Sequence, residues 1–276
     1  MSAKLISGLE VSKGLLSDVA EKIKRQREQD PSFNAVLAIV QVGNRSDSNV
    51  YVGAKIKKAA EVGAEGKLIK LPDTITQEEL EVEIDKLNKD DNIDGIIVQL
   101  PLDCKNPIDA DAVIDKINPF KDVDGLTREN AGRLMRGELS RTIFPCTPYG
   151  CLYLVQKATG DENYVVGKNV VVLGRSKIVG APAAALFLWH HGTTTKTHMI
   201  PDTETSWFRA RPEISKESGE QHGSRNENNH DRTIKIAVKK GGQALGIFES
   251  VERRLQTGSN DALKERLERT SVGQRS

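Results

Sequence analysis

The chain has 276 residues, of which 37% are hydrophobic and 29% charged, with a formal net charge of +1. This length accommodates one large or two modest domains. The balanced charge gives no basic stripe for nucleic acid, and no apolar run approaches the ~20 residues of a membrane span. The first residues lack the apolar core of a signal peptide. Three cysteines cannot build a disulfide framework, which favours a reducing compartment. Together, these observations predict a soluble cytoplasmic protein without nucleic-acid or membrane partners.

The first part of the chain predicts alternating helices and strands. Apolar residues recur at helical spacing in some segments, and others are almost continuous apolar runs of strand length. Thr76 and Glu79 are spaced as a capping box, which predicts a helix start. The expected order is helix 11–23, strand 35–42, helix 51–62, strand 67–71, helix 80–87 and strand 93–100. Such alternation predicts an α/β fold with a parallel sheet covered on both faces, whose ligands lie at the carboxyl ends of the strands.

A second α/β unit is predicted to begin near Cys146. Thr147 and Pro148 indicate a helix start, because threonine can cap a helix and proline at the first helical position loses no needed N–H. The segments that follow are helix 149–158, strand 169–173, a helix through 185–189 and strand 193–195. They predict one strand–helix–strand unit of a second parallel sheet.

The composition changes near residue 199. Residues 217–232 contain no aliphatic or aromatic side chain, a composition close to that of disordered chains. Within this part of the chain, only residues 234–238 and a charged, helix-like segment at 261–269 keep a pattern typical of secondary structure. We therefore expect a divergent polar tail over 199–276.

A glycine-containing loop between the predicted strand at 169–173 and the next helix is the first candidate site. Gly174, Ser176 and Gly180 stand where a dinucleotide-binding loop needs a tight turn and a close backbone approach to phosphate. Ser176 replaces the usual middle glycine, and an ordinary strand-to-helix turn is an equal interpretation. Arg175 favours a 2′-phosphate, hence NADP over NAD, unless it is simply solvated.

Other candidates lie before this loop. Tyr51 and Lys55 share one helix face, where tyrosine can stack on a flat heterocycle and lysine can move protons, although such pairs also occur on ordinary amphipathic helices. Gln99 ends a buried-type strand, where its side chain can point into a cleft or simply meet water. Asp124 lies in an Asp-Gly turn, for which plain turn chemistry is the alternative. All five histidines lie beyond residue 189, so we predict no metal site, and Cys146 is interpreted as a packed thiol.

Taken in order, five motifs resemble the bifunctional methylenetetrahydrofolate dehydrogenase/methenyltetrahydrofolate cyclohydrolase family. The resemblance covers about residues 1 to 198. The motifs are Asp47-Ser-Asn-Val-Tyr-Val-Gly-Ala-Lys55, Val98-Gln-Leu-Pro-Leu102, Lys121-Asp-Val-Asp-Gly125, Pro145-Cys-Thr-Pro148 and Gly174-Arg-Ser-Lys-Ile-Val-Gly-Ala-Pro182.

The resemblance implies a folate-binding catalytic domain at 1–147 and the start of a Rossmann-type NAD(P)-binding domain at 148–198. It implies NADP as cofactor, with NAD as the alternative, and a homodimer. It also implies oxidation of 5,10-methylenetetrahydrofolate and hydrolysis of the methenyl product to 10-formyltetrahydrofolate. The implied roles are catalysis for Lys55, Gln99 and Tyr51, substrate binding for Ser48, Tyr51 and Asp124, and cofactor binding for Gly174, Arg175, Ser176 and Gly180.

After Thr197-His198 the sequence departs from the family pattern. The glycine-rich segment that the resemblance implies over the nicotinamide is missing from the sequence. Three interpretations therefore stand: a bifunctional enzyme, a folate-binding fragment that has lost the dehydrogenase, or an unstable product with open strand edges. Hydrolysis is expected to survive better than oxidation, because its implied residues all precede residue 125.

Overall fold

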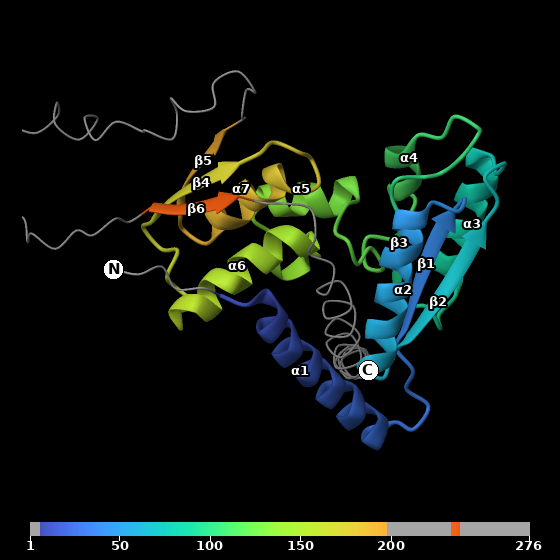
Figure 1. The fold of residues 1–276 in the computed structure, drawn as a ribbon, viewed down its shortest axis with the longest axis horizontal. Helices are drawn as coiled ribbons and strands as arrows, with labels where there is room; N and C mark the ends of the chain where they lie inside the picture. The colour runs from blue at the N-terminus through green and yellow to red at the C-terminus, as the bar shows by residue number, and fades with distance from the viewer. Residues whose placement is uncertain (1–5, 198–232, 238–276) are drawn as a thin grey trace, which may run out of the picture.

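A computed structural model of the chain describes residues 6–197 and 233–237, and it contains two α/β units (Figure 1). In the first unit, β1 (Val36–Val42) is the central strand, with β2 (Glu65–Leu71) on one side and β3 (Gly95–Val98) on the other. All pairs are parallel, in the order β2-β1-β3. The strands are connected by α2 (Ser46–Glu61) and α3 (Gln77–Lys89), and α1 (Gly8–Gln29) precedes them. The predicted parallel sheet is confirmed.

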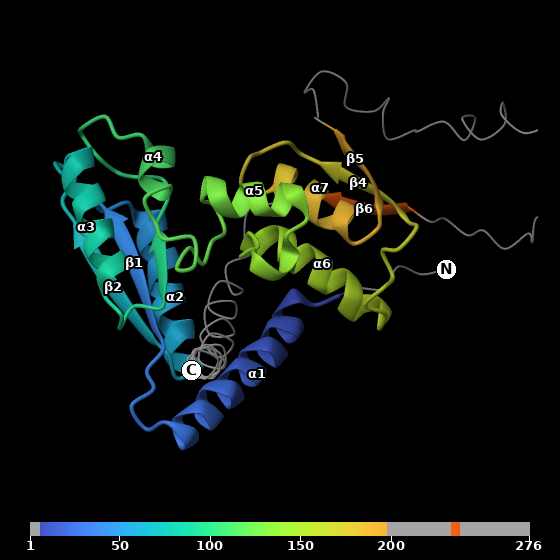
Figure 2. The same cartoon turned by 180° about the vertical axis from the view of Figure 1, so that it is seen from behind.

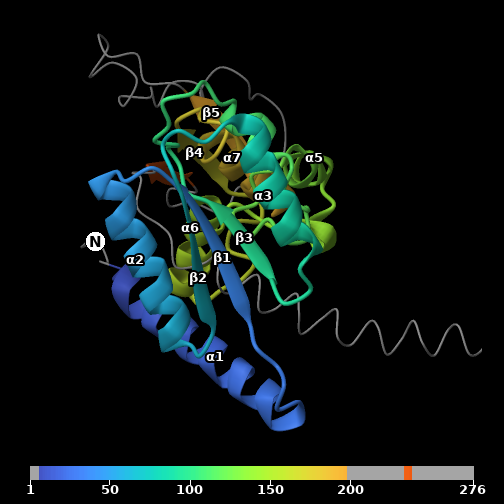
Figure 3. The ribbon, with the colours of Figure 1, turned by 90° about the vertical axis from the view of Figure 1, so that its right-hand side faces the viewer.

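The alternation of side chains along β1 divides the first core in two. Leu37 and Ile39 face a cluster that includes residues of α1 and α2, whereas Ala38 and Val40 face a cluster built with α3 and α4 (Ala110–Ile114). Figure 3 shows α2 and α3 on opposite sides of the sheet. Because both faces are covered, every residue of β1 is buried, as expected for the central strand of such a sheet.

The predicted capping box is confirmed at the start of α3. The Glu79 N–H donates to Thr76 Oγ1 at 3.2 Å, and the Thr76 N–H donates to the Glu79 carboxylate at 2.9 Å. The strand predicted at 93–100 is shorter, because β3 spans only Gly95–Val98. Its last backbone bond to β1 is the Gln99 N–H to Val40 O contact at 2.8 Å, which leaves the Gln99 side chain at the carboxyl edge of the sheet.

The second unit has its own sheet and core. Its elements are α5 (Arg128–Arg136), η1 (Leu139–Arg141), α6 (Cys146–Thr159), β4 (Asn169–Leu173), α7 (Gly180–Trp189), β5 (Thr193–Thr197) and β6 (Thr233–Ala237). The strands are parallel in the order β5-β4-β6. In Figure 2, α5 lies beside α7. A buried cluster around Leu152, Val172 and Leu186 forms the core.

The predicted helix start, with Thr147 as cap and Pro148 as first helical residue, is two residues too late. The helix α6 already begins at Cys146, with Pro145 as the preceding cap residue and no side-chain cap. Pro148 is therefore the third helical residue. Proline is still accepted there, because the N–H groups of the first turn have no partner within the helix.

Of the predicted polar tail, the structure describes only Thr233–Ala237, which pairs with β4 as β6. The charged segment predicted at 261–269 lies outside the described residues. The domain boundaries at 147 and 198 stay predictions. Among the helices described, none combines the length and the apolar character that crossing a membrane requires.

Candidate functional site

A cavity of about 480 Å³ opens between the two units. Its wall includes every residue that the sequence analysis assigned to catalysis or folate binding, together with apolar residues that it did not single out. The lining residues are Asp47, Ser48, Tyr51, Lys55, Val98, Gln99, Leu100, Pro101, Asp124, Leu126, Pro145, Cys146, Thr147, Ile178 and Val179.

The helix α2 supplies four of these side chains, including that of Asp47. Ser48, Tyr51 and Lys55 are spaced by three and four residues, which places them on one face of the helix. Lys55 is only 7% exposed, whereas Tyr51 is 43% exposed. The first unit therefore places a buried amine at the cavity wall and an accessible phenol ring beside it.

The Lys55 amine is held by the end of β3. Its Nζ donates to Gln99 Oε1 at 3.0 Å, and the Gln99 amide in turn donates to Leu100 O at 2.7 Å. The second contact orients the amide, so that its oxygen and not its NH₂ group faces the amine. The two catalytic candidates are thus brought into direct contact.

Ser48 is 3% exposed, and its hydroxyl oxygen has no hydrogen-bond partner among the described residues. A buried hydroxyl that stays unpaired costs free energy. Since Ser48 lines the cavity, a polar group of a bound ligand is the partner that this position fits.

Asp124 enters the cavity from the turn that follows the first sheet. Burial raises the pKa of its carboxyl group; Lys55 lowers this pKa and Asp122 raises it further. The Cys146 thiol lies 3.7 Å from Asp124 Oδ1. The carboxylate is thus kept in a cavity wall that disfavours its charge, a setting in which N–H donors of a ligand would stabilise the charged form.

At the rim, Arg45 and Asp47 form a two-pronged ion pair, with nitrogen-to-oxygen distances of 3.0 and 2.8 Å. The hydrogen bond from Arg45 lowers the pKa of Asp47 to about 2. Both side chains are about half exposed, so this pair contributes little to stability.

The glycine loop makes the tight turn that the sequence analysis expected between β4 and α7. Gly174 has φ of +139°, and a Cβ placed there would meet nothing within 4 Å. A Cβ at Gly180 would lie 2.5 Å from Gly174 O, so only glycine lets α7 begin so close to the turn. Ser176 Oγ accepts the Gly180 N–H at 3.2 Å, while Arg175 is exposed. This loop follows β4, so it lies at the carboxyl end of the second sheet.

The same loop reaches the cavity of Lys55, because Ile178 and Val179 line it. Ile178, Val179 and Pro145 lie in the family motifs, but the sequence analysis gave them no role in the site. It missed Leu126 altogether, since an apolar residue in an irregular segment carries no pattern of its own. Within the residues that the structure describes, no cluster of metal-ligating side chains is present.

Comparison with sequence families gives two matches. The profile of the tetrahydrofolate dehydrogenase/cyclohydrolase catalytic domain matches residues 6–124, and that of the NAD(P)-binding domain of the same family matches residues 145–211. The second match extends beyond residue 198, where the resemblance by motif ends. The chain therefore contains an NAD(P)-binding domain in sequence as well as in fold.

Individual relatives agree with these profiles. The chain is 47% identical over 196 residues to the human cytoplasmic C-1-tetrahydrofolate synthase, an alignment that covers 71% of this chain and 21% of the relative. It is 44% identical over 198 residues to the bifunctional protein FolD of Bacillus mycoides, covering 72% and 66%. The chain thus spans about a fifth of the length of the curated synthases that it matches.

Solved structures show the same architecture. The bifunctional FolD enzyme of Campylobacter jejuni superposes with a TM-score of 0.66 at 34% identity, covering 72% of this chain and 67% of that one. The FolD of Trypanosoma brucei, solved with NADP cofactor and an inhibitor, gives 0.65 at 35% identity, covering 72% and 65%.

Proposed function

Because the chain belongs to the tetrahydrofolate dehydrogenase/cyclohydrolase family, we propose that it oxidises 5,10-methylenetetrahydrofolate and hydrolyses the methenyl product to 10-formyltetrahydrofolate. NADP is the proposed hydride acceptor, and the cytoplasm and a homodimer are the proposed location and assembly. The observation that carries the proposal is the contact of Lys55 with Gln99 in a cavity that the glycine loop also lines.

Folate binding is assigned to three side chains of the cavity. The exposed ring of Tyr51 can stack on the pterin. Asp124 has a carboxylate that can accept two parallel N–H bonds from the aminopyrimidinone edge. Ser48 brings a buried hydroxyl that lacks a partner among the described residues. Together they bind a flat, polar-edged heterocycle against Lys55.

Hydrolysis follows from the position of Lys55. In its neutral form the amine takes a proton from the water that attacks the methenyl carbon, so that a carbon–oxygen bond forms. The ammonium then returns that proton to N5 as the carbon–N5 bond breaks, while the new hydroxyl group loses its proton to solvent water and becomes the carbonyl of the formyl group on N10. Gln99 accepts a hydrogen bond from the amine and keeps it aimed at the substrate. One residue thus acts first as base and then as acid.

Cofactor binding is assigned to the glycine loop. The tight turn at Gly174 and the close approach of Gly180 to it would let the pyrophosphate come near the backbone, and Ser176 would add a hydroxyl. Arg175 is the side chain proposed to favour the 2′-phosphate of NADP over NAD. The nicotinamide, when bound, accepts a hydride from the methylene carbon. The chain's own part is to orient the two molecules, with Ile178 and Val179 excluding water between them.

The alternative function is a folate-binding hydrolase without dehydrogenase activity. One observation favours it, since Lys55, Gln99 and Asp124 all lie in the first unit, and hydrolysis needs no hydride acceptor. If only one activity is present, it should therefore be hydrolysis.

The deciding experiment is a pair of assays on the purified 276-residue chain. Methenyltetrahydrofolate is supplied without NADP, and methylenetetrahydrofolate is supplied with NADP. Activity in both assays supports the bifunctional enzyme, and hydrolysis alone supports the alternative. Dehydrogenase activity alone, or no activity from a chain shown to be folded, overturns the proposal.

A further inference from the structure

The turn that carries Asp124 is built around a buried carboxylate that does not line the cavity. Asp122 is 1% exposed. Its oxygens accept the N–H of Leu126 at 3.2 Å, the N–H of Thr127 at 2.9 Å and the side-chain amide of Asn130 at 3.0 Å. Three donors thus fix the carboxylate, and the backbone between Asp122 and Thr127 is closed into a compact turn.

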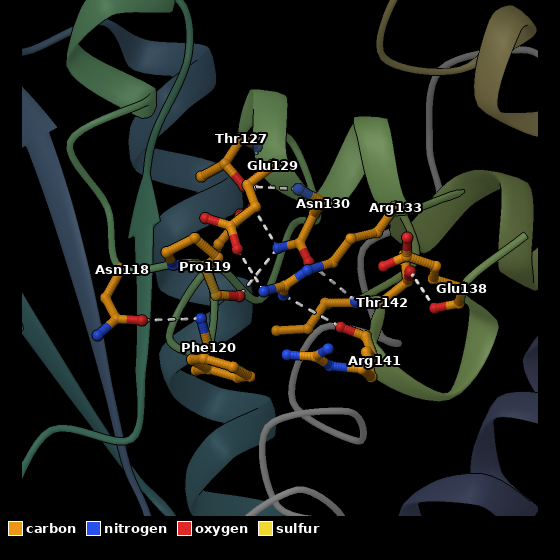
Figure 4. Close-up of polar contacts among 12 residues, drawn as sticks. Asn118, Pro119, Phe120, Thr127, Glu129, Asn130, Arg133, Glu138, Arg141 and Thr142 are labelled. Atoms are coloured by element: carbon orange, nitrogen blue, oxygen red, sulfur yellow. Dashed lines mark hydrogen bonds and ion pairs between the residues drawn. The ribbon is translucent and has the colours of Figure 1, made fainter. Parts of the chain in front are cut away.

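Asn130, in the first turns of α5, is fully buried and joins three segments (Figure 4). Its Nδ2 donates both to Asp122 and to Pro119 O, the latter at 2.9 Å, and its Oδ1 accepts the Ile143 N–H at 3.2 Å. Arg133 adds a second link from the same helix, since it donates to Arg141 O at 3.2 Å and lies 5.1 Å from the centre of the Phe120 ring.

Two of these segments, the one that contains Asp122 and the one that contains Ile143, lead into the cavity. Asp124 follows Asp122 by two residues, and Pro145 follows Ile143 by two residues. Between them Gly125 packs so tightly that a Cβ would lie 2.4 Å from Ile143 O. The distance between the Asp124 carboxylate and the start of α6 therefore depends on how Asp122 and Asn130 hold these two segments.

We propose that Asp122 and Asn130 are positioning residues, which set the Asp124 carboxylate and the Pro145–Thr147 segment at the spacing that binds the pterin edge. The inference rests on the proposed folate function, and it adds two residues that touch no substrate.

The first test compares Asn130→Ala with Asn118→Ala. Asn118 lies four residues before Asp122, and its side chain accepts the Phe120 N–H at 2.9 Å (Figure 4). Among the described residues it makes no side-chain hydrogen bond to Asp122. Binding of tetrahydrofolate is measured by calorimetry well below the unfolding temperature. Asn130→Ala should weaken binding about tenfold or more, because a misplaced binding group loses much of its interaction. Asn118→Ala should bind like the unchanged chain. Equal affinities of both variants and the unchanged chain overturn the inference.

A double-mutant comparison separates positioning from general loosening. If Asn130 acts through Asp124, Asn130→Ala should have little further effect on binding in an Asp124→Asn background. The same loss in both backgrounds overturns the inference. If Asn130→Ala is recovered unfolded, Asp122→Asn takes its place in both experiments, since it keeps the side-chain size and changes the donor pattern.

A readout without ligand keeps this inference distinct from the proposed function. In a Cys104→Ser, Cys151→Ser background, Cys146 is the remaining thiol, and it is 9% exposed beside Asp124. Asn130→Ala should raise its rate of reaction with a thiol reagent several-fold. A chain that fails to bind tetrahydrofolate counts against the proposed function, and the thiol rate then decides the inference. An unchanged rate overturns it.

Discussion

The Lys55 amine donates a hydrogen bond of 3.0 Å to the side-chain oxygen of Gln99, a residue 44 positions further along the chain. Both side chains are more than nine-tenths buried. The contact joins the face of α2 to the carboxyl edge of β3, so two elements of the first sheet unit jointly fix the amine in the cavity wall. An amine held in this way is suited to repeated proton transfer.

Replacing Lys55 by methionine keeps the length of the side chain and removes the amine. Methenyltetrahydrofolate hydrolysis should fall by at least about 100-fold, the usual contribution of a positioned acid–base group. The matched control is Lys57→Met, because Lys57 is exposed on the same helix. Loss of methenyltetrahydrofolate is followed by absorbance, and urea unfolding confirms that both variants fold. Unchanged hydrolysis by Lys55→Met would assign the proton transfer to another group.

Replacing Gln99 by glutamate places a carboxylate beside the amine. The carboxylate accepts a charge-assisted hydrogen bond, so it holds the protons of the amine more firmly than the amide oxygen does. Hydrolysis at about pH 7 should fall roughly tenfold, the rate change that corresponds to ~1.4 kcal/mol of activation free energy. The same substitution at the exposed Gln29 is the control. Faster hydrolysis by Gln99→Glu than by the unchanged chain would contradict this role for the amide.

The regular elements were predictable because their signals are local. The capping box of Thr76 and Glu79 and the apolar run of β1 each specify an element within a few residues. The start of α6 was misplaced because Thr147 resembles a cap, while the helix already begins at Cys146.

The candidate site was predictable only where its residues lie on such elements or in family motifs. Tyr51 and Lys55 share a helix face, which spacing alone reveals. The Asp122–Asn130 contact lies across an irregular turn, and Ile178 meets the cavity only through the placement of one unit against the other. Neither relationship produces a regular spacing of residues that could be recognised in the sequence.

Ser48→Ala separates binding from stability. The hydroxyl is buried without a hydrogen-bond partner among the described residues, so its removal should leave the free energy of unfolding unchanged or raise it by up to about 1 kcal/mol. If the ligand supplies the missing partner, the affinity for tetrahydrofolate should fall by about 3- to 10-fold, the value of one ordinary hydrogen bond. Urea unfolding and calorimetry measure the two quantities. Destabilisation without loss of affinity would rule out the assigned role.

Asp124→Asn tests the electrostatics of the cavity. The pKa of Asp124 is raised above its ordinary value of 3.8, chiefly by burial. The folded chain therefore binds more protons than the unfolded chain at pH values above 3.8 and up to the raised pKa, and over that window stability falls as the pH rises. Asparagine removes this loss. Asp124→Asn should thus be more stable than the unchanged chain at about pH 7, and the difference should vanish as the pH falls below the ordinary value. Urea unfolding over a pH series measures the difference, and a constant gap would contradict the assignment.

Gly125→Ala tests whether the turn and the start of α6 pack as tightly as the cavity requires. At φ of +62°, a Cβ would lie 2.4 Å from Ile143 O and 2.9 Å from Pro145 N, so both backbone strain and a clash with backbone are expected. Together they should cost about 3 kcal/mol or more. Gly160→Ala is the matched control, because its φ is +69° and a Cβ there meets nothing within 4 Å, which leaves a strain of about 1 kcal/mol. The two free energies of unfolding are compared in urea. Equal losses would show that the segment around Ile143 yields readily, in which case it cannot hold Asp124 at a fixed distance from α6.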